Sequence, residues 1–189
     1  MDKNTLRLSL KAWRQTLTPA IITASAAGHL RMCATNGLLD APGPWHLYAS
    51  LPGEAETQWL WDELLHREIT VLFSRTIPKD HRLEPCQISN AGDLVPGPMK
   101  ILQPRPGLPA WGGAIGIIIV PWLAFGLRGE RLGFGAGYYD RFLAQYPQAR
   151  RIGLCLDDQI RQDIPMEAHD EPLDALLTPT RFILTGARP

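Results

Sequence analysis

The sequence contains few cysteines, and none of them is placed to bind zinc or to form a disulfide framework. There are three, Cys33, Cys86 and Cys155, which lie far apart and include no CxxC pair. An odd number of widely spaced cysteines is typical of a protein whose thiols stay reduced, as they do in the cytoplasm. We therefore predict a cytoplasmic protein with free thiols.

Two further absences exclude broad classes of protein. No apolar run reaches the roughly 18 residues of a membrane-spanning helix, and the N-terminal residues lack the apolar segment of a secretory signal. Basic and acidic residues number 19 each, so the chain lacks the basic excess that is typical of nucleic-acid binding. We expect neither a membrane protein nor a nucleic-acid-binding protein.

The composition is that of a globular protein. Of the 189 residues, 45% are hydrophobic and 20% are charged, which provides enough apolar material for one core. The sequence shows no internal repeat, low-complexity tract or linker that would divide it. We predict a single domain over residues 1–189, and a monomer.

The order of apolar and polar residues predicts an alternation of helices and strands. We expect helices over residues 3–17, 19–39 and 54–66, and strands over residues 45–50, 69–73, 115–120, 151–156, 173–177 and 181–184. Short antiparallel strands and loops are expected over residues 74–111. Glu54 and Glu56 would lie in the first turn of the third helix, where acids suit the helix dipole. This alternation is typical of an α/β fold with a mostly parallel sheet covered on both faces.

Residues 115–146 form the most informative stretch, a strand followed by a glycine-rich loop and a helix. The strand stops at Pro121, four glycines lie between positions 129 and 137, and aromatic residues then recur every four positions, the spacing of a helix. A glycine-rich turn before a helix N-terminus exposes backbone N–H groups that can bind a phosphate. The alternative is a turn that needs glycine only for positive φ angles, since neither a P-loop nor a GxGxxG motif is present.

Each charged side chain near this loop, or able to reach it, has two interpretations. Arg131 could neutralise phosphate oxygens or be a solvated loop arginine. Asp140 could ligate magnesium or simply suit the helix dipole. Lys3 and Arg7 lie four residues apart on one helix face, where they could clamp an anion or form a solvated surface. Asp170 follows a histidine, and the two could bind a metal or hydrogen-bond each other.

Residues Val120 to Leu143 resemble the signature VPxLAFxxxGxRLGxGxGYYDRxL of the 5-formyltetrahydrofolate cyclo-ligase family, also called 5,10-methenyltetrahydrofolate synthetase. The string is long and irregular, so chance agreement is very improbable. Shorter matches follow the family's order along the chain. They are Lys3, Leu6-Arg7 and Arg14; Glu54-Ala-Glu56-Thr57; Phe73-Ser-Arg75; and Gln159, Pro165, Glu167 and His169-Asp170.

The resemblance implies an enzyme that converts 5-formyltetrahydrofolate to 5,10-methenyltetrahydrofolate, with ATP as co-substrate and Mg²⁺ as cofactor. ADP and phosphate are released, because the formyl oxygen is phosphorylated before the folate ring closes. The implied fold is a three-layer α/β/α sandwich with a mostly parallel central sheet, related to the sugar-phosphate isomerase/CoA-transferase group.

Carried over position by position, the resemblance also implies the site residues. Arg131 and Tyr138 would be catalytic. The ATP-binding residues would be Lys3, Arg7, Arg131, Gly133, Phe134, Gly135, Ala136, Gly137, Tyr138 and Tyr139. Leu51, Glu56 and Tyr138 would contact the folate. Asp140 and Asp170 would ligate Mg²⁺, which prefers carboxylate oxygens.

The chain departs from the family's pattern at four positions. Many members have an aspartate where this chain has Gly116 and another where it has Gly126, while Ser74 replaces a usual proline and Gln103 a frequent glutamate. Loss of a carboxylate near the phosphate site could lower turnover by roughly 10–100-fold. A catalytically weak paralogue that binds nucleotide or folate is therefore the alternative to an active enzyme. An unrelated sugar-phosphate enzyme would need a nucleophilic carboxylate site, which the sequence does not indicate.

Overall fold

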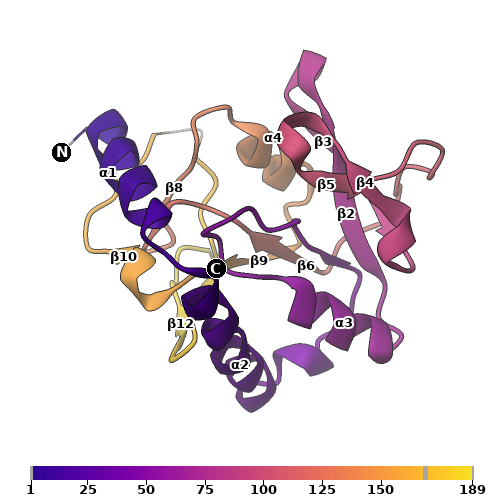
Figure 1. Ribbon diagram of the computed structural model, residues 1–189, viewed down its shortest axis with the longest axis horizontal. Coiled ribbons are helices and arrows are strands. Elements are labelled where there is room, and N and C mark those ends of the chain that lie inside the picture. The colour runs from indigo at the N-terminus through magenta and orange to yellow at the C-terminus, as the bar shows by residue number, and fades with distance from the viewer. Residues whose placement is uncertain (1, 168–169, 189) are drawn as a thin grey trace.

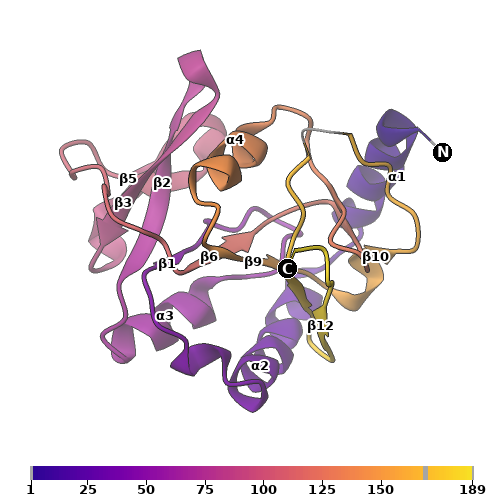
Figure 2. The same ribbon diagram turned by 180° about the vertical axis from the view of Figure 1, so that it is seen from behind.

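The computed structural model describes residues 2–167 and 170–188. At its centre is a seven-stranded sheet in the order β12-β11-β9-β6-β1-β2-β3 (Figure 1). The five inner strands run parallel, and the edge strands β3 and β12 are antiparallel to their neighbours. Figure 2 shows these two edges on opposite sides of the molecule. The strands are β1 Trp45–His46, β2 Val71–Ile77, β3 Arg82–Ile88, β6 Ile117–Val120, β9 Arg150–Leu154, β11 Ala175–Leu177 and β12 Phe182–Leu184.

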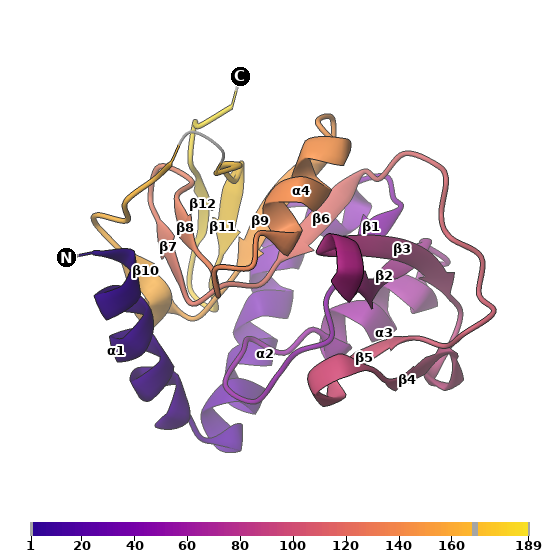
Figure 3. The ribbon, with the colours of Figure 1, turned by 90° about the horizontal axis from the view of Figure 1, so that it is seen from above.

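Helices cover both faces of this sheet. The helices are α1 Lys3–Gln15, α2 Pro19–Thr35, α3 Gln58–His66 and α4 Tyr138–Gln145. Figure 3 shows α2 and α3 on one side of the sheet and α4 on the other. The predicted α/β fold with a mostly parallel central sheet is therefore confirmed, whereas the relation to sugar-phosphate isomerases and CoA-transferases stays a prediction.

The strand β6 shows how the two faces are filled. Its side chains are all buried and point alternately to opposite faces. Ile117 and Ile119 belong to the cluster that contains Leu60 of α3, and Ile118 belongs to the cluster that contains Phe142 of α4. A continuous apolar run is what a parallel strand buried on both faces requires.

Two smaller sheets complete the structure. The strands β4 Leu94–Pro96 and β5 Leu102–Pro104 form a hairpin, and β10 Ile160–Arg161, β7 Ala124–Gly126 and β8 Arg131–Leu132 form a three-stranded sheet. The helix α1 lies beside this second sheet (Figure 3), where Leu10 packs with Leu123, Leu132 and Ile164. This packing brings the N-terminal helix to the glycine-rich loop that follows β8.

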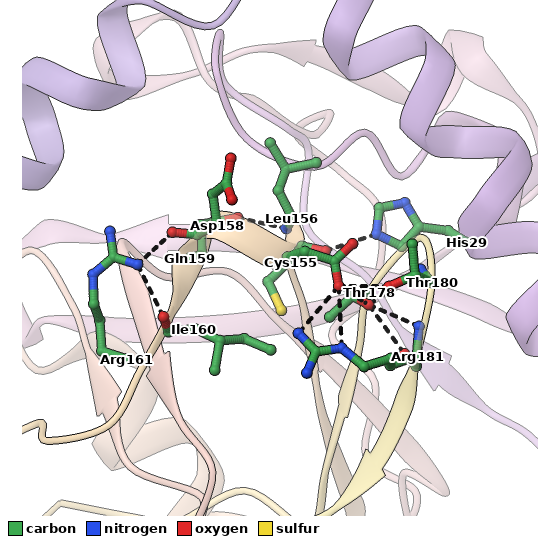
Figure 4. Close-up of polar contacts among 11 residues, drawn as sticks. His29, Cys155, Leu156, Asp158, Gln159, Ile160, Arg161, Thr178, Thr180 and Arg181 are labelled. Atoms are coloured by element: carbon green, nitrogen blue, oxygen red, sulfur yellow. Dashed lines mark hydrogen bonds and ion pairs between the residues drawn. The ribbon is translucent and has the colours of Figure 1, made fainter.

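The C-terminal strands are tied to β9 by one carboxylate. Asp157 Oδ1 accepts hydrogen bonds from the hydroxyl groups of Thr178 (2.8 Å) and Thr180 (2.7 Å), and Arg181 lies 3.3 Å away. Figure 4 shows Thr178, Thr180 and Arg181 around this point, with His29 of α2 bonded to the carbonyl oxygen of Cys155 close by. Because several donors already converge on this one oxygen, the cluster has a structural role.

Several predicted boundaries are wrong. The helix predicted over residues 54–66 begins at Gln58, and no acidic residue lies in its first turn. Glu54 instead accepts a hydrogen bond from the Leu51 N–H (2.8 Å) and pairs with Arg14 of α1 (3.1 Å). The strand predicted over residues 45–50 is limited to β1, although the Leu47 N–H still donates to the Leu72 carbonyl oxygen at 2.9 Å. The contact of Glu54 with the distant Arg14 accounts for the misplaced start of the helix, because local propensity does not register such a contact.

The other elements agree with the prediction within a few residues, including the parallel pair β1 and β2 joined by α3. Cys33, Cys86 and Cys155 are free, and all three are buried. None of the helices in the described part of the chain has the length and apolarity needed to cross a membrane.

The buried His46 of β1 is expected to make the protein acid-sensitive. Its ring packs on Phe142 and shares a 2.8 Å hydrogen bond with Ser74, the serine that replaces the usual proline. Burial lowers the pKa of His46 to about 3, against 6.5 for the free side chain. Between these two pKa values the unfolded chain binds a proton at His46 that the folded protein does not bind. The free energy of unfolding should therefore fall as pH falls, by about 1.4 kcal/mol per pH unit where the two states differ by one full proton.

Urea unfolding between about pH 7 and pH 4.5 measures this effect. His46→Gln should show a shallower loss of stability than wild type, because glutamine does not titrate. The matched control is His66→Gln at the exposed end of α3, which should keep the wild-type slope. Equal slopes for wild type and His46→Gln would contradict the assignment.

Candidate functional site

A cavity of about 260 Å³ lies where α1, the glycine-rich loop, the start of α4 and the segment before β11 meet. It opens beyond the carboxyl end of β6, the side on which open α/β sheets bind ligands. The lining residues are Lys3, Arg7, Trp122, Arg131, Leu132, Gly133, Gly135, Gly137, Asp140, Glu167 and Asp170. The structure thus gathers many of the predicted site residues from both ends of the chain.

Arg131 lies at the back of this cavity with its side chain only 2% exposed, so it is not a solvated loop arginine. Its Nη2 group pairs with Asp140, and its guanidinium carbon lies 4.8 Å from the centre of the Trp122 ring. The Nε and Nη1 groups have no hydrogen-bond partner among the described residues. Burial lowers the pKa of Arg131. A buried cation with unused donors is suited to an incoming anion.

Two basic side chains of α1, those of Lys3 and Arg7, line the same cavity. Lys3 Nζ lies 2.8 Å from Asp170 Oδ2 and 3.0 Å from Glu167 Oε1. Arg7 Nε donates to the Gly133 carbonyl oxygen at 2.8 Å. The interpretation of these two residues as a solvated face is therefore wrong, because both make contacts that fix α1 on the site.

The charges of Lys3 and Asp170 reinforce each other. Partial burial acts against the charged form of Lys3, but its hydrogen bonds with Asp170 and Glu167 outweigh that effect and raise the pKa of Lys3. For Asp170, partial burial is likewise outweighed by the hydrogen bonds from Lys3 and the Glu167 backbone and by the charge of Arg131, so its pKa is lowered. Both groups are therefore ionised at neutral pH.

The loop glycines serve two purposes. Gly135 and Gly137 have φ angles of +98° and +68°, so the interpretation that the turn needs positive φ angles holds for them. At position 133 only glycine fits beside the Trp122 ring, because a Cβ atom there would overlap the ring. All three glycines also line the cavity, which keeps the phosphate-binding interpretation compatible with the geometry.

Four of the residues predicted to bind ATP lie outside the cavity lining. Phe134 is 48% exposed, with Lys11 Nζ and the Arg14 guanidinium carbon each 5.7 Å from its ring centre. Ala136 is exposed, and the ring of Tyr138 lies tilted against that of His81 with ring centres 5.3 Å apart. Tyr139 packs edge-to-face on Trp122, and burial raises its pKa.

The residues predicted to contact folate lie on the neighbouring loop between β1 and α3, except for Tyr138. Leu51 donates its N–H to Glu54, and the Glu56 carbonyl oxygen accepts from Trp59 Nε1 at 2.7 Å. None of Leu51, Glu56 and Tyr138 lines the cavity described above. Arg14 links the two regions, since it also donates to the Pro52 carbonyl oxygen at 2.9 Å.

The two predicted magnesium ligands, Asp140 and Asp170, both line the cavity and both face basic partners. Their carboxylate oxygens are the type of ligand that Mg²⁺ takes together with substrate phosphates. The described residues contain no cluster of three or more potential metal-ligating side chains. His169, which precedes Asp170, lies outside the described residues.

The structure explains the glycines that replace aspartates. A Cβ atom on Gly116 would lie 2.7 Å from the Pro42 carbonyl oxygen, so this position is restricted by packing. At Gly126 a side chain would collide with the carboxylate of Glu130, which is buried and accepts a 2.9 Å hydrogen bond from the Arg128 N–H. Glu130, four residues after Gly126, thus places its carboxylate beside that glycine.

Among the remaining departures, Gln103 accepts a 3.2 Å hydrogen bond from the Thr76 N–H and so joins β5 to β2.

Sequence reasoning also missed residues of the site itself. Trp122 occupies an open position of the signature, so no motif points to it. Glu54 and Arg14 lie within matched patterns, but only the structure shows that they pair.

Comparison with known proteins identifies the family. The model of the 5-formyltetrahydrofolate cyclo-ligase family matches residues 1–179. The chain belongs to this family. It is 31% identical over 142 residues to the 5-formyltetrahydrofolate cyclo-ligase of Escherichia coli K12, covering 71% of this chain and 77% of that protein. It is 35% identical over 156 residues to the mitochondrial 5-formyltetrahydrofolate cyclo-ligase of Arabidopsis thaliana, covering 69% of this chain and 56% of that protein.

The chain spans about half the length or less of several curated cyclo-ligase relatives that it matches, for example 44% of the protein of Saccharomyces cerevisiae. Solved structures show that the cyclo-ligase family shares this fold. The 5,10-methenyltetrahydrofolate synthetase of Aquifex aeolicus superposes with a TM-score of 0.84 at 24% identity, covering 98% of this chain and 94% of that one. The Mycoplasma pneumoniae synthetase gives 0.74 at 21% identity, with coverages of 95% and 99%.

Proposed function

We propose that the protein converts 5-formyltetrahydrofolate to 5,10-methenyltetrahydrofolate with ATP and Mg²⁺, releasing ADP and phosphate. The observation that carries the proposal is the buried Arg131, whose Nε and Nη1 donors are unused in a cavity that Lys3 and Arg7 also line. Membership of the cyclo-ligase family supports the substrate. We extend the proposal to a monomeric, cytoplasmic enzyme.

The proposed chemistry solves a leaving-group problem. The formyl oxygen attacks the γ-phosphorus of ATP, a new P–O bond forms, and ADP departs with the electrons of the broken bond. N10 of the folate then adds to the activated carbon, loses its proton, and the ring closes as the C–O bond breaks and phosphate leaves. Catalysis then depends on positioning the groups and on neutralising the phosphate charge.

Each part of the site has a role in this proposal. Arg131, Lys3 and Arg7 neutralise phosphate oxygens, and the glycine loop adds backbone N–H groups at the start of α4. Mg²⁺, held by Asp140 and Asp170, would supply further charge neutralisation at the phosphates. Leu51, Glu56 and Tyr138 contact the folate, and Glu56 is suited to accept hydrogen bonds from the pterin ring.

An absorbance assay tests the proposal directly. Purified protein, ATP, Mg²⁺ and 5-formyltetrahydrofolate should generate the near-ultraviolet absorbance of the methenyl product, and omission of ATP should abolish it. Folded protein at high concentration that yields no product would refute the proposed reaction.

The alternative is a catalytically weak paralogue that binds nucleotide or folate as a module. The absence of an aspartate at Gly126 favours it, although the Glu130 carboxylate lies beside that position. Calorimetry that detects ATP and folate binding in a protein without turnover would support this alternative. Normal turnover would exclude it.

Arg7→Ala is expected to raise the KM for ATP by roughly tenfold or more, which is the effect of losing one charged hydrogen-bonding group. The KM for folate should change by less than about twofold. The reason is that Arg7 lines the cavity and holds the Gly133 carbonyl oxygen, whereas the predicted folate contacts lie elsewhere. Arg31→Ala, an exposed arginine of α2, is the control and should leave both constants unchanged. Equal increases in both KM values would argue against phosphate binding by Arg7.

A further inference from the structure

Trp122 lies just after β6 and Pro121, at the position that the family signature leaves open. Its side chain is buried and forms part of the cavity lining. None of the roles derived from the motif includes this residue. Its contacts nevertheless connect it to Arg131 and to the glycine-rich loop, the two elements on which the proposed phosphate site depends.

One contact of the indole ring is with the catalytic arginine. The Arg131 guanidinium carbon lies 4.8 Å from the ring centre, within the roughly 6 Å range of a cation–π interaction. Such an interaction is stronger in a desolvated site, and the Arg131 side chain is only 2% exposed. The ring therefore limits the directions in which the guanidinium can point.

A second contact of the ring is with the loop backbone. A Cβ atom on Gly133 would overlap three carbons of the Trp122 ring, so the ring packs directly on the backbone at that residue. The carbonyl oxygen of Gly133 is held by Arg7. Trp122 therefore sets the position of the loop relative to both arginines.

Trp122 is itself held firmly. Its ring packs edge-to-face on Tyr139 with centres 5.8 Å apart, and its carbonyl oxygen accepts from Gln159 Nε2 at 2.9 Å. The other end of the buried Gln159 amide accepts from the Leu156 N–H at 2.8 Å (Figure 4). A side chain supported in this way can fix the rotamer of its neighbour.

Three buried N–H groups on two residues that line the cavity have no partner among the described residues. They are Trp122 Nε1 and the Nε and Nη1 groups of Arg131. Leaving such donors unpaired is costly, and an anion with several oxygens would satisfy more than one of them. We propose that Trp122 is a positioning residue that holds Arg131 toward the nucleotide phosphates, and that its indole N–H joins the donors that bind them. This inference rests on the proposed function.

Two substitutions separate the functions of the ring. Trp122→Phe keeps an aromatic face under Arg131 but loses the N–H, and should weaken ATP binding by roughly tenfold in calorimetry. Trp122→Leu loses the face as well and should weaken it by roughly a hundredfold. Binding of 5-formyltetrahydrofolate should change by less than about twofold in both. Trp111→Phe is the matched control, since Trp111 bonds to the Ala114 carbonyl oxygen outside the cavity and should bind both ligands like wild type.

Fluorescence provides a readout that a purely structural role would not change. Addition of ATP and Mg²⁺ should alter the tryptophan emission of wild type and Trp111→Phe, and the change should disappear in Trp122→Phe. Wild-type ATP affinity in Trp122→Phe and Trp122→Leu, or equal losses of ATP and folate binding with a lowered melting temperature, would overturn the inference. If wild type binds ATP but shows no turnover, the proposed reaction is refuted. The comparison of ATP binding between wild type and the Trp122 variants still tests the role of Trp122.

Discussion

Arg131→Met is expected to lower kcat/KM for ATP by roughly a thousandfold, the scale on which a single arginine contributes to phosphoryl transfer. The arginine is buried, pairs with Asp140 and stacks on Trp122, so water cannot replace its charge at the back of the cavity. The measurement is turnover at saturating folate over a range of ATP concentrations, together with the melting temperature. Some loss of stability is also expected, because the substitution leaves Asp140 without its partner.

Arg131→Lys distinguishes geometry from charge. A lysine keeps the positive charge and can still pair with Asp140, but its compact ammonium cannot also stack on Trp122 and present two further N–H groups. We expect about a hundredfold lower kcat/KM for ATP with a melting temperature near that of wild type. Arg67→Met, at the exposed end of α3, is the control and should be fully active. Turnover of Arg131→Met within about fivefold of wild type would exclude the phosphate role.

The sequence predicts the fold well where a pattern repeats along the chain. The apolar run at residues 115–120 predicts a strand, and the structure places β6 in the centre of the sheet with its side chains buried. Lys3 and Arg7 at helical spacing predict a shared face, and both residues line one cavity. These features depend on residues that are close in sequence, or on a signature long enough to specify a family.

Features that depend on distant contacts could not be predicted. The start of α3 is misplaced because Glu54 pairs with Arg14, forty residues earlier, and stabilises a turn where the local pattern favours helix. The Arg131 guanidinium carbon lies 4.8 Å from the ring centre of Trp122, a residue that no motif specifies. The carboxylate next to Gly126 comes from Glu130, a residue that a position-by-position comparison with the family does not consider.

Asp140→Asn is expected to lower turnover by roughly a hundredfold or more with the fold retained. Asp140 lies in the first turn of α4 and pairs with Arg131, so it could serve as a magnesium ligand or only as the partner of a buried cation. Loss of the carboxylate at the helix N-terminus should cost about 0.3–1 kcal/mol, in addition to the lost pairing with Arg131, and asparagine keeps the size of the side chain. Turnover and circular dichroism test both parts of the expectation.

The magnesium dependence decides between the two roles of Asp140. If Asp140 ligates Mg²⁺, the Mg²⁺ concentration for half-maximal rate should rise in Asp140→Asn. If it only balances Arg131, that concentration should stay the same and the melting temperature alone should fall. Asp174→Asn is the matched control, because Asp174 pairs with Arg188 at 3.0 Å, is 21% exposed against 18% for Asp140, and lies outside the cavity lining. Titration with ATP in the absence of Mg²⁺ should show the opposite effect on affinity. Removal of the Asp140 charge leaves Arg131 uncompensated, so Asp140→Asn should bind metal-free ATP more tightly than wild type does. Asp174→Asn should bind it with wild-type affinity.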